Sequence, residues 1–281
     1  MSGGLSEKAF VMFQQYIEEQ CGIAIGKEKA YLIESRLTKL LVETRLNSFE
    51  ELYRLLASKK DPKLVEKVID AITTNETLWF RDKTPWQVLE DELMAAYIDM
   101  IRTERRKIRI WSAAASSGQE AYSTIFSIDQ YLKKHSIKDV TLNDFEIIGT
   151  DISGPILEIA KAGRYDPISI MRGLDPKYKD IYFNNEGRVW IVKDEYKKHV
   201  TFKRFNLQSS FYSLGKFDLV FCRYVMIYFS QQFKKEMSKK LSESLRPQGV
   251  LFVGNSEIFP DYKEHFIMKQ YNKGVYYQIK E

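Results

Sequence analysis

One segment of the chain changes from the pattern of a strand to that of a helix across a loop of small residues. Ile108, Ile110 and Trp111 are the β-branched and aromatic residues of a short buried strand. Six small residues and Gly118 follow, and from Gln119 onward apolar residues recur at helical spacing. Such a loop leaves backbone N–H groups open to a ligand, which is how open α/β sheets hold nucleotide-like cofactors. The same residues also suit close packing of a helix on a strand, so the loop alone does not distinguish a cofactor site from close packing.

A second predicted strand, Phe145 to Asp151, ends in an acid. It reads F-E-I-I-G-T-D, which is a buried strand followed by a carboxylate. An acid in this place can accept hydrogen bonds from both hydroxyl groups of a ribose, so Asp151 favours a nucleoside cofactor. A dinucleotide dehydrogenase is disfavoured, because Ser112 to Gly118 lacks the G-x-G-x-x-G spacing that a pyrophosphate requires.

Composition limits the class of protein and of partner. With 281 residues, 44% of them hydrophobic and 29% charged, the chain is typical of a globular protein with room for more than one domain. Its net charge of +5 comes from 43 basic and 38 acidic residues spread along the whole sequence. A nucleic-acid binder concentrates its basic residues on one face, so we expect no nucleic-acid partner. An acidic protein surface remains a suitable partner.

Cysteine usage and the lengths of the apolar runs indicate the compartment. Cys21 and Cys222 lie far apart and no secretory hydrophobic segment opens the chain, so we expect reduced thiols and a cytoplasmic location. Apolar runs such as 218–222 are far shorter than the ~20 residues of a membrane-spanning helix, so we expect no membrane insertion.

The first part of the chain has the periodicity of helices. We predict helices over 5–20, 27–45, 48–58 and 62–73, joined by short polar turns, and hence an α-helical domain over residues 1–74. The exposed face of the second helix is expected to carry four basic residues: Lys29, Arg36, Lys39 and Arg45. Mixed charge is routine on a solvated helix, so this face has either no partner or an acidic one.

The segment that follows, Thr73 to Arg81, reads T-T-N-E-T-L-W-F-R. It interleaves polar groups with Leu78, Trp79 and Phe80, so part of it must be buried while its polar groups find partners. Two bulky aromatic residues argue against a plain linker. The N-cap of a following helix, with an aromatic plug, would give the same pattern.

The rest of the sequence predicts an α/β domain over residues 75–281. Beyond the two strands above, we predict helices over 152–163 and 231–245, buried strands at 217–222 and 250–254, and a final hairpin of 266–269 and 275–279. Val189 to Val192 and Val200 to Phe202 are predicted as short antiparallel strands of a small β subdomain inserted at about 165–202. This order is the layout of the Rossmann-like S-adenosylmethionine-dependent methyltransferase fold.

Five segments occur in a fixed order along the chain. They are T-T-N-E-T-L-W-F-R, W-S-A-A-A-S-S-G-Q-E-A-Y-S, I-I-G-T-D-I-S, F-D-L-V-F-C-R-Y-V-M-I-Y-F and L-R-P-Q-G-V-L-F-V-G-N-S-E. They resemble the signature segments of the CheR-type chemotaxis receptor methyltransferases, and the helical front end is similar to that family's N-terminal domain. The resemblance implies a protein-glutamate O-methyltransferase that uses S-adenosylmethionine, releases S-adenosylhomocysteine and acts on the cytoplasmic helices of methyl-accepting chemotaxis receptors.

The resemblance also assigns cofactor contacts to individual residues. Those expected to contact the cofactor are Asn75, Thr77, Arg81, Glu120, Asp151, Asn206, Leu207, Arg223 and Tyr224. Asp151 matches the family's ribose acid. Asn206 and Leu207 match the pair that flanks the adenine, and Arg223 and Tyr224 lie beside the methionine end.

The leading hypothesis is an enzyme in which two residues place the reacting groups. Arg81 and Tyr228 are expected to place the substrate carboxylate and the methyl donor. The chain also departs from the family pattern, because the family usually has Asn where this chain has Tyr224 and often has Glu where it has Gln119. A tyrosine offers a single hydroxyl at the end of a large ring, whereas Asn offers a compact donor and acceptor.

The implied chemistry asks for no catalytic base. A glutamate carboxylate, with an unperturbed pKa of about 4.3, is ionised at pH 7 and can attack the sulfonium methyl group directly. Catalysis is then positioning and exclusion of water from the carboxylate. We therefore expect no catalytic histidine or cysteine, and we expect His135, His199 and His265 at the surface.

Alternatives of other classes remain at this point. One is a signalling module that binds S-adenosylmethionine or S-adenosylhomocysteine and has lost turnover through Tyr224. Another is a methyltransferase for a small molecule or RNA, although a helical front domain with a basic face suits a helical protein substrate better. In either case we expect a monomer and no metal site.

Overall fold

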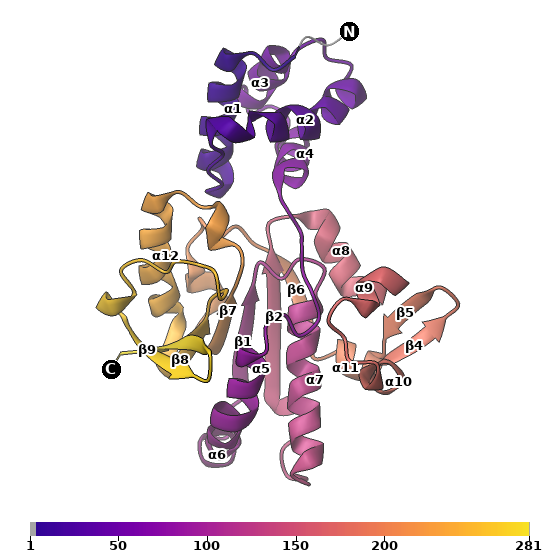
Figure 1. Cartoon of the computed structure of the whole chain (residues 1–281), viewed down its shortest axis with the longest axis vertical. Helices are drawn as coiled ribbons and strands as arrows, with labels where there is room; N and C mark the ends of the chain where they lie inside the picture. Colours follow the sequence, from indigo (N-terminus) through magenta and orange to yellow (C-terminus); the bar gives the residue numbers. More distant parts are fainter. Residues whose placement is uncertain (1–3, 281) are drawn as a thin grey trace.

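The computed structural model describes residues 4–280, in which a helical N-terminal part lies above an α/β part (Figure 1). The helices of the N-terminal part are α1 (Glu7–Cys21), α2 (Ala30–Thr44), α3 (Phe49–Ala57) and α4 (Pro62–Ile72), with the 3₁₀ turn η1 (Lys27–Lys29) before α2. The Ser6 and Ser48 hydroxyls accept N–H groups of the first turns of α1 and α3, as N-caps do. The four helices predicted here are confirmed, with small shifts of their ends.

The N-terminal helices pack around a hydrophobic core of their own. Its fully buried side chains include Phe13 of α1, Ile33 and Leu37 of α2, and Val68 of α4. This core is separate from the two cores of the sheet, so the helical part is a structural unit attached to the α/β part through surface contacts.

The α/β part is built on a seven-stranded sheet of the described chain with the order β6-β2-β1-β7-β8-β10-β9. Its strands are β1 (Ile108–Ala113), β2 (Phe145–Asp151), β6 (Val200–Arg204), β7 (Phe217–Cys222), β8 (Leu245–Phe252), β9 (Phe266–Tyr271) and β10 (Gly274–Ile279). From β6 to β8 neighbouring strands are parallel, and β10 and β9 form the predicted terminal hairpin. The strand order reverses between β1 and β7, and open α/β sheets bind ligands in the crevice at such a point.

Helices cover both faces of the sheet. They are α5 (Thr84–Val88), the π-helical turn η2 (Leu89–Leu93), α6 (Met94–Glu104), α7 (Gln119–Lys134), α8 (Gly154–Ala162) and α12 (Gln231–Ser244). The stretch from α5 to α8 buries its apolar side chains in one core, while α12 packs into the core on the other face. The helices over 84–104 were not predicted, although four apolar residues recur there at helical spacing: Trp86, Leu89, Leu93 and Tyr97. Short 3₁₀ turns complete the chain: η3 (Leu142–Asp144), η4 (Phe211–Leu214), η5 (Met226–Tyr228) and η6 (Tyr262–Glu264).

A small antiparallel sheet is inserted after α8 and lies to the right of the main sheet in Figure 1. It contains β3 (Arg164–Tyr165), β4 (Phe183–Glu186) and β5 (Val189–Val192), with the short helices α9 (Pro167–Met171), α10 (Lys177–Tyr182) and α11 (Asp194–Lys197). The prediction that Val200 and Phe202 belong to this subdomain is wrong, because they lie in β6, which pairs in parallel with β2. An edge strand buries one face, so its alternating pattern imitates an antiparallel strand.

No helix within residues 4–280 is long and apolar enough to cross a bilayer.

The inserted subdomain is fastened to the segment after α4 at Gly173. Gly173 has φ 94°, and a Cβ added there would lie 2.2 Å from the carbonyl oxygen of Trp79. Gly187, in the turn between β4 and β5, has φ 68° and nothing within 4 Å of an added Cβ. The two glycines therefore share a left-handed backbone and differ in the space around them.

We expect Gly187→Ala to cost about 1–2 kcal/mol of unfolding free energy, the cost of a left-handed alanine. Gly173→Ala should cost at least about 1 kcal/mol more, because the backbone of Trp79 has to move. Urea unfolding of the two variants measures the difference. Equal losses would mean that the Trp79 segment yields easily and is not held by this contact.

Candidate active site

A cavity lies where the sequence predicts a cofactor, at the carboxyl ends of four adjacent parallel strands. Its empty volume, counted out to its open mouth, is about 910 Å³. The strand ends contribute Ala114 and Ser116 after β1, Asp151 and Ile152 at β2, Phe205 to Leu207 after β6, and Arg223 to Val225 after β7. These residues are far apart in sequence. The strand order brings them together, because the carboxyl ends of adjacent parallel strands meet at one edge of the sheet.

The structure brings together all ten residues that the resemblance singles out. The cavity is lined by Asn75, Thr77, Arg81, Glu120, Asp151, Asn206, Leu207, Arg223, Tyr224 and Tyr228. Gln119 is buried beside it and accepts a hydrogen bond from the Ser117 hydroxyl at 2.8 Å. Of the histidines expected at the surface, His135 is exposed, whereas His199 and His265 are half-buried away from the cavity.

The N-terminal part closes one side of the cavity, which the sequence analysis did not predict. Its contributions are Cys21, Ile23, Thr73 and Thr74. The carbonyl of Gln20 at the end of α1 accepts a hydrogen bond from the Asn206 side chain at 2.7 Å. Since the last carbonyls of a helix have no partner within the helix, the loop after β6 caps α1.

The segment 73–81 is turned toward the cavity by its aromatic residues. Trp79 is 1% exposed, and its indole N–H donates to the carbonyl of Ser169 at 3.0 Å. The backbone N–H of Phe80 donates to the Ser123 hydroxyl of α7 at 3.1 Å. Trp79 is buried and Phe80 half-buried in the α/β part, and the polar side chains on either side of them, Thr77 and Arg81, line the cavity. The expectation that part of this segment is buried is confirmed, whereas the N-cap alternative is wrong, because the N-cap of α5 is Lys83 and has no side-chain cap hydrogen bond.

The loop after β1 is more constrained than predicted. Ala114, Ser116 and Gly118 all have positive φ, between 51° and 94°. The N–H groups of Ala115, Ser116 and Gly118 are already bonded to Thr150 O, Asp151 Oδ2 and Ala115 O. The prediction that the loop leaves its N–H groups open is wrong for these three, because the end of β2 binds the first two and the loop itself binds the third.

Asp151 combines burial with donors that hold it in place. Its two carboxylate oxygens accept the N–H groups of Ser116 at 2.9 Å and Ser153 at 3.0 Å. Burial raises the pKa of Asp151 above its ordinary value, although these backbone donors act in the opposite direction. Each oxygen keeps lone pairs beyond its single backbone bond, so the carboxylate can still accept hydroxyl groups of a ligand in the cavity.

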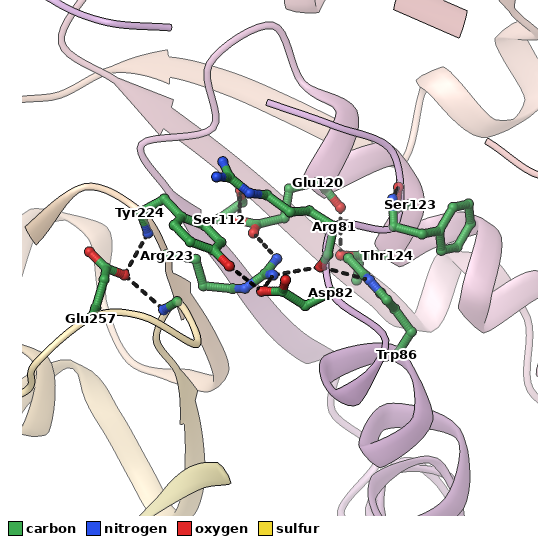
Figure 2. Close-up of polar contacts among 12 residues, drawn as sticks. Arg81, Asp82, Trp86, Ser112, Glu120, Ser123, Thr124, Arg223, Tyr224 and Glu257 are labelled. Atoms are coloured by element: carbon green, nitrogen blue, oxygen red, sulfur yellow. Dashed lines mark hydrogen bonds and ion pairs between the residues drawn. The ribbon is translucent and has the colours of Figure 1, made fainter. Parts of the chain in front are cut away.

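A buried ion cluster joins three segments of the cavity wall (Figure 2). The Arg223 side chain is 1% exposed, and its guanidinium donates to Glu120 Oε2 at 2.8 Å and to Asp82 Oδ2 at 2.7 Å. It also donates to the backbone carbonyl of Arg81 at 2.5 Å. Asp82 was not predicted as a site residue, and nothing in its spacing distinguishes it from any acid after an arginine. The Arg223 guanidinium thus ties β7, α7 and the segment 73–81 together.

Arg81 has the opposite surroundings. Among residues 4–280 no carboxylate lies within ion-pair distance of its guanidinium, which donates a long hydrogen bond of 3.3 Å to the carbonyl of Glu76. The guanidinium carbon lies 3.4 Å from the centre of the Tyr224 ring. Of the two arginines at the cavity, Arg223 is neutralised and buried, whereas Arg81 keeps donors for an incoming anion.

Glu257 fixes the loop after β7 from outside the cavity. Its carboxylate accepts the N–H groups of Tyr224 at 2.5 Å, Gly254 at 2.7 Å and Ile227 at 3.2 Å. Burial raises the pKa of Glu257, and the backbone donors counteract this. No role was predicted for Glu257. Its position as the last residue of a signature segment was the one indication in the sequence that it has a role.

We expect Arg223→Met to lower the unfolding free energy by about 3–5 kcal/mol, because it leaves Asp82 and Glu120 without a cation in a buried place. The same substitution at the half-exposed Arg81 is the matched control and should cost less than about 1 kcal/mol. Chemical unfolding at neutral pH measures both. Similar losses would mean that the Arg223 cluster does not brace the fold.

Comparison with known proteins identifies the two parts of the chain. Residues 8–73 match the family model described as CheR methyltransferase, all-alpha domain, and residues 75–275 match the model described as CheR methyltransferase, SAM binding domain. The chain is 40% identical over 272 residues to a chemotaxis protein methyltransferase of Pseudomonas putida, covering 96% of this chain and 98% of that protein. The identity is 41% with one from Pseudomonas aeruginosa (96% and 97% covered) and 39% with one from Vibrio anguillarum (98% and 98%).

The similarity extends over nearly the full length of both chains, and the resembling segments are those whose side chains meet in the cavity. With both family models matched in order, the chain belongs to the CheR methyltransferase family.

Proposed function

We propose that this protein transfers the methyl group of S-adenosylmethionine to glutamate carboxylates of chemotaxis receptors and releases S-adenosylhomocysteine. The observation that carries the proposal is one cavity that is lined both by the buried acid Asp151 and by a guanidinium without a carboxylate partner in the described chain, that of Arg81. The assignment of receptors as substrates rests on the similarity to chemotaxis protein methyltransferases. Because the receptor helices that would be methylated are cytoplasmic, the proposed location of the enzyme is the cytoplasm. The proposed oligomeric state is a monomer.

The residues of the cavity fit S-adenosylmethionine. The Asp151 carboxylate would accept both ribose hydroxyls, and Asn206 and Leu207 would flank the adenine. Asn75, Thr77, Glu120 and Tyr224 would meet the remaining polar groups. The Arg223 guanidinium is occupied by Asp82 and Glu120, so a contact from this residue would come from its backbone. The cofactor supplies an electrophilic methyl group.

The protein's contribution to the reaction is positioning. The Arg81 fork would bind the substrate carboxylate through two parallel N–H donors and hold one oxygen on the line of attack. Tyr228 lines the same cavity and offers its hydroxyl as a second orienting group. Ile23 and Phe229, which also line it, exclude water from the carboxylate. Because that carboxylate is already ionised at neutral pH, no proton has to be moved by the enzyme.

The prediction that Arg36 belongs to an exposed basic face of α2 is wrong. The Arg36 guanidinium donates to the carbonyls of Ile72 and Thr73 and to the Thr74 hydroxyl. Its long side chain reaches the carbonyls left open at the end of α4, so it supports the cavity wall and is not available to a partner. Lys39 and Arg45 are exposed, and they are the residues we propose to meet acidic receptor helices.

The function is tested by incubating the protein with S-adenosylmethionine and a cytoplasmic receptor fragment and locating added methyl groups by mass spectrometry. We expect methyl groups on glutamate side chains. Arg81→Lys keeps the charge and loses the fork, so turnover should fall at least about tenfold while affinity for S-adenosylhomocysteine changes much less. Binding of S-adenosylhomocysteine without transfer to any fragment would instead support a signalling module.

Asp151→Ala removes a charged acceptor whose hydrogen bonds are worth roughly 1.5–3 kcal/mol, so affinity for S-adenosylhomocysteine should fall about ten- to a hundredfold. Calorimetry on the folded variant measures this. An unchanged dissociation constant would remove Asp151 from the cofactor site.

The same titration has a pH dependence of known sign. Ribose hydroxyls donate to the ionised carboxylate, so affinity of the unaltered protein should weaken as pH falls through the raised pKa of Asp151. The weakening should start at a higher pH than an ordinary aspartate would give, and the Asp151→Ala variant should lack it.

Reversing the charges of Lys39 and Arg45 to Glu should slow receptor methylation, more strongly at low salt where screening is weak. Cofactor affinity should stay the same, because neither residue lines the cavity. The matched control is the same reversal at Lys269 and Lys273 of the terminal hairpin. An equal effect of the two pairs would indicate general electrostatic attraction and would contradict a docking face on α2.

A further inference from the structure

Tyr224 occupies a backbone conformation that its side chain disfavours. Its φ is 58°, in the left-handed region where Gly, Asn and Asp are tolerated and bulky residues are outliers. Phe80 and Asp82, on either side of Arg81, also have positive φ, of 47° and 58°. Strained backbone that clusters in this way points to a functional constraint on the side chains that it presents. Here those side chains are Arg81 and Tyr224, which contact each other.

Tyr224 is held both at its backbone and at its hydroxyl (Figure 2). Its backbone N–H donates to Glu257 Oε2 at 2.5 Å, and its hydroxyl donates to Asp82 Oδ2 at 2.6 Å. Burial raises the pKa of Tyr224, so the hydroxyl keeps the proton that it donates. Asp82 is in turn fixed by the buried Arg223 guanidinium. The ring is therefore a rigid surface, connected through Asp82 to the cluster that braces the cavity wall.

The Arg81 guanidinium lies on this surface, with its carbon 3.4 Å from the ring centre. Within residues 4–280 the one hydrogen bond of this guanidinium is the 3.3 Å bond to the carbonyl of Glu76, which is too long to fix a flexible side chain by itself. The backbone of Arg81 is held, since its carbonyl accepts from Trp86 and Arg223. The orientation of the guanidinium thus depends on the Tyr224 ring.

An aromatic support differs from a carboxylate support in what it leaves free. A carboxylate partner would occupy the N–H fork and neutralise its charge, as happens at Arg223. A ring contacts the flat face of the guanidinium by cation–π attraction and leaves the N–H donors at its edge available. Tyr224 can therefore order Arg81 without reducing its attraction for an anion.

We propose that Tyr224 is a positioning residue that holds the Arg81 guanidinium ready for the substrate carboxylate. The inference rests on the proposed function, in which Arg81 orients that carboxylate. It adds a second role to Tyr224, which is proposed above as a cofactor contact, because the ring acts through Arg81. It also gives the departure from the family's usual Asn a role in this chain.

The test is a double-mutant cycle of Tyr224→Asn and Arg81→Lys, with turnover and S-adenosylhomocysteine affinity measured for each variant. Asparagine tolerates the left-handed backbone, so Tyr224→Asn should keep its melting temperature. We expect its turnover to fall about tenfold, with cofactor affinity changed less than about threefold. In the Arg81→Lys background the same change should cost less than about twofold, because the contact is already lost. Tyr224→Phe keeps the ring and should lose less than Tyr224→Asn.

Tyr212→Asn is the matched control, since Tyr212 is 94% exposed and lies outside the cavity. If the losses from the two site substitutions multiply, or if Tyr224→Asn acts on cofactor affinity alone, Tyr224 acts only as a cofactor contact and the inference is overturned.

A readout that does not depend on turnover separates this inference from the proposed function. In nuclear magnetic resonance relaxation, the order parameter of the Arg81 Nε–H group should fall in Tyr224→Asn, while that of Arg223 stays high. An unchanged Arg81 order parameter would overturn the inference even if glutamate methylation is found. Loss of order together with an absence of methyl transfer by the unaltered protein would contradict the proposed function instead.

Discussion

The buried guanidinium of Arg223 is the interaction on which the cavity depends. It joins the end of β7 to Glu120 at the start of α7 and to Asp82 just after the segment 73–81. These three segments are separated by long stretches of sequence, and each contributes a wall of the cavity. A charge buried to this degree is tolerable when carboxylates and a carbonyl surround it, so the cluster enforces one arrangement of the walls. An enzyme that works by positioning requires such a fixed frame.

The frame lets two arginines at one cavity do different work. Arg223 is neutralised by two carboxylates and braces the walls, whereas Arg81 has an aromatic face beneath it and no carboxylate partner in the described chain. The difference does not follow from residue type. It follows from the neighbours, because a carboxylate occupies the donors of a guanidinium and a ring does not. Tyr224 and Asp82 connect the two arginines, so the order of the uncommitted one derives from the burial of the other.

Periodicity and chain order were enough to predict most helices and strands and the position of the cofactor site. They were not enough to predict which side chains and strands far apart in the sequence contact one another. The convergence of Asp151 with the other motif residues follows from parallel strands, whose carboxyl ends meet at one edge. β6 was misassigned because its alternation does not reveal its partner. Arg36 was expected on an exposed face, but its length lets it reach the end of a neighbouring helix. Asp82 carries no local pattern, and the position of Glu257 at the end of a signature segment does not reveal its role, since both roles arise from backbone and charge partners that folding brings to them.

The attachment of the N-terminal part to the sheet extends the same frame to the surface proposed for docking. The end of α1 accepts the Asn206 amide from the loop after β6, and the N–H of Ala24 donates to the carbonyl of Tyr228 at 2.8 Å. The end of α1 thus contacts the loop proposed to flank the adenine, and the segment after α1 contacts a residue proposed to orient the substrate. Because α2 follows this segment directly, a receptor helix docked on α2 would be held at a defined distance from the cavity. Fixing that distance is what converts recognition by an exposed charged face into positioning at the reacting carboxylate.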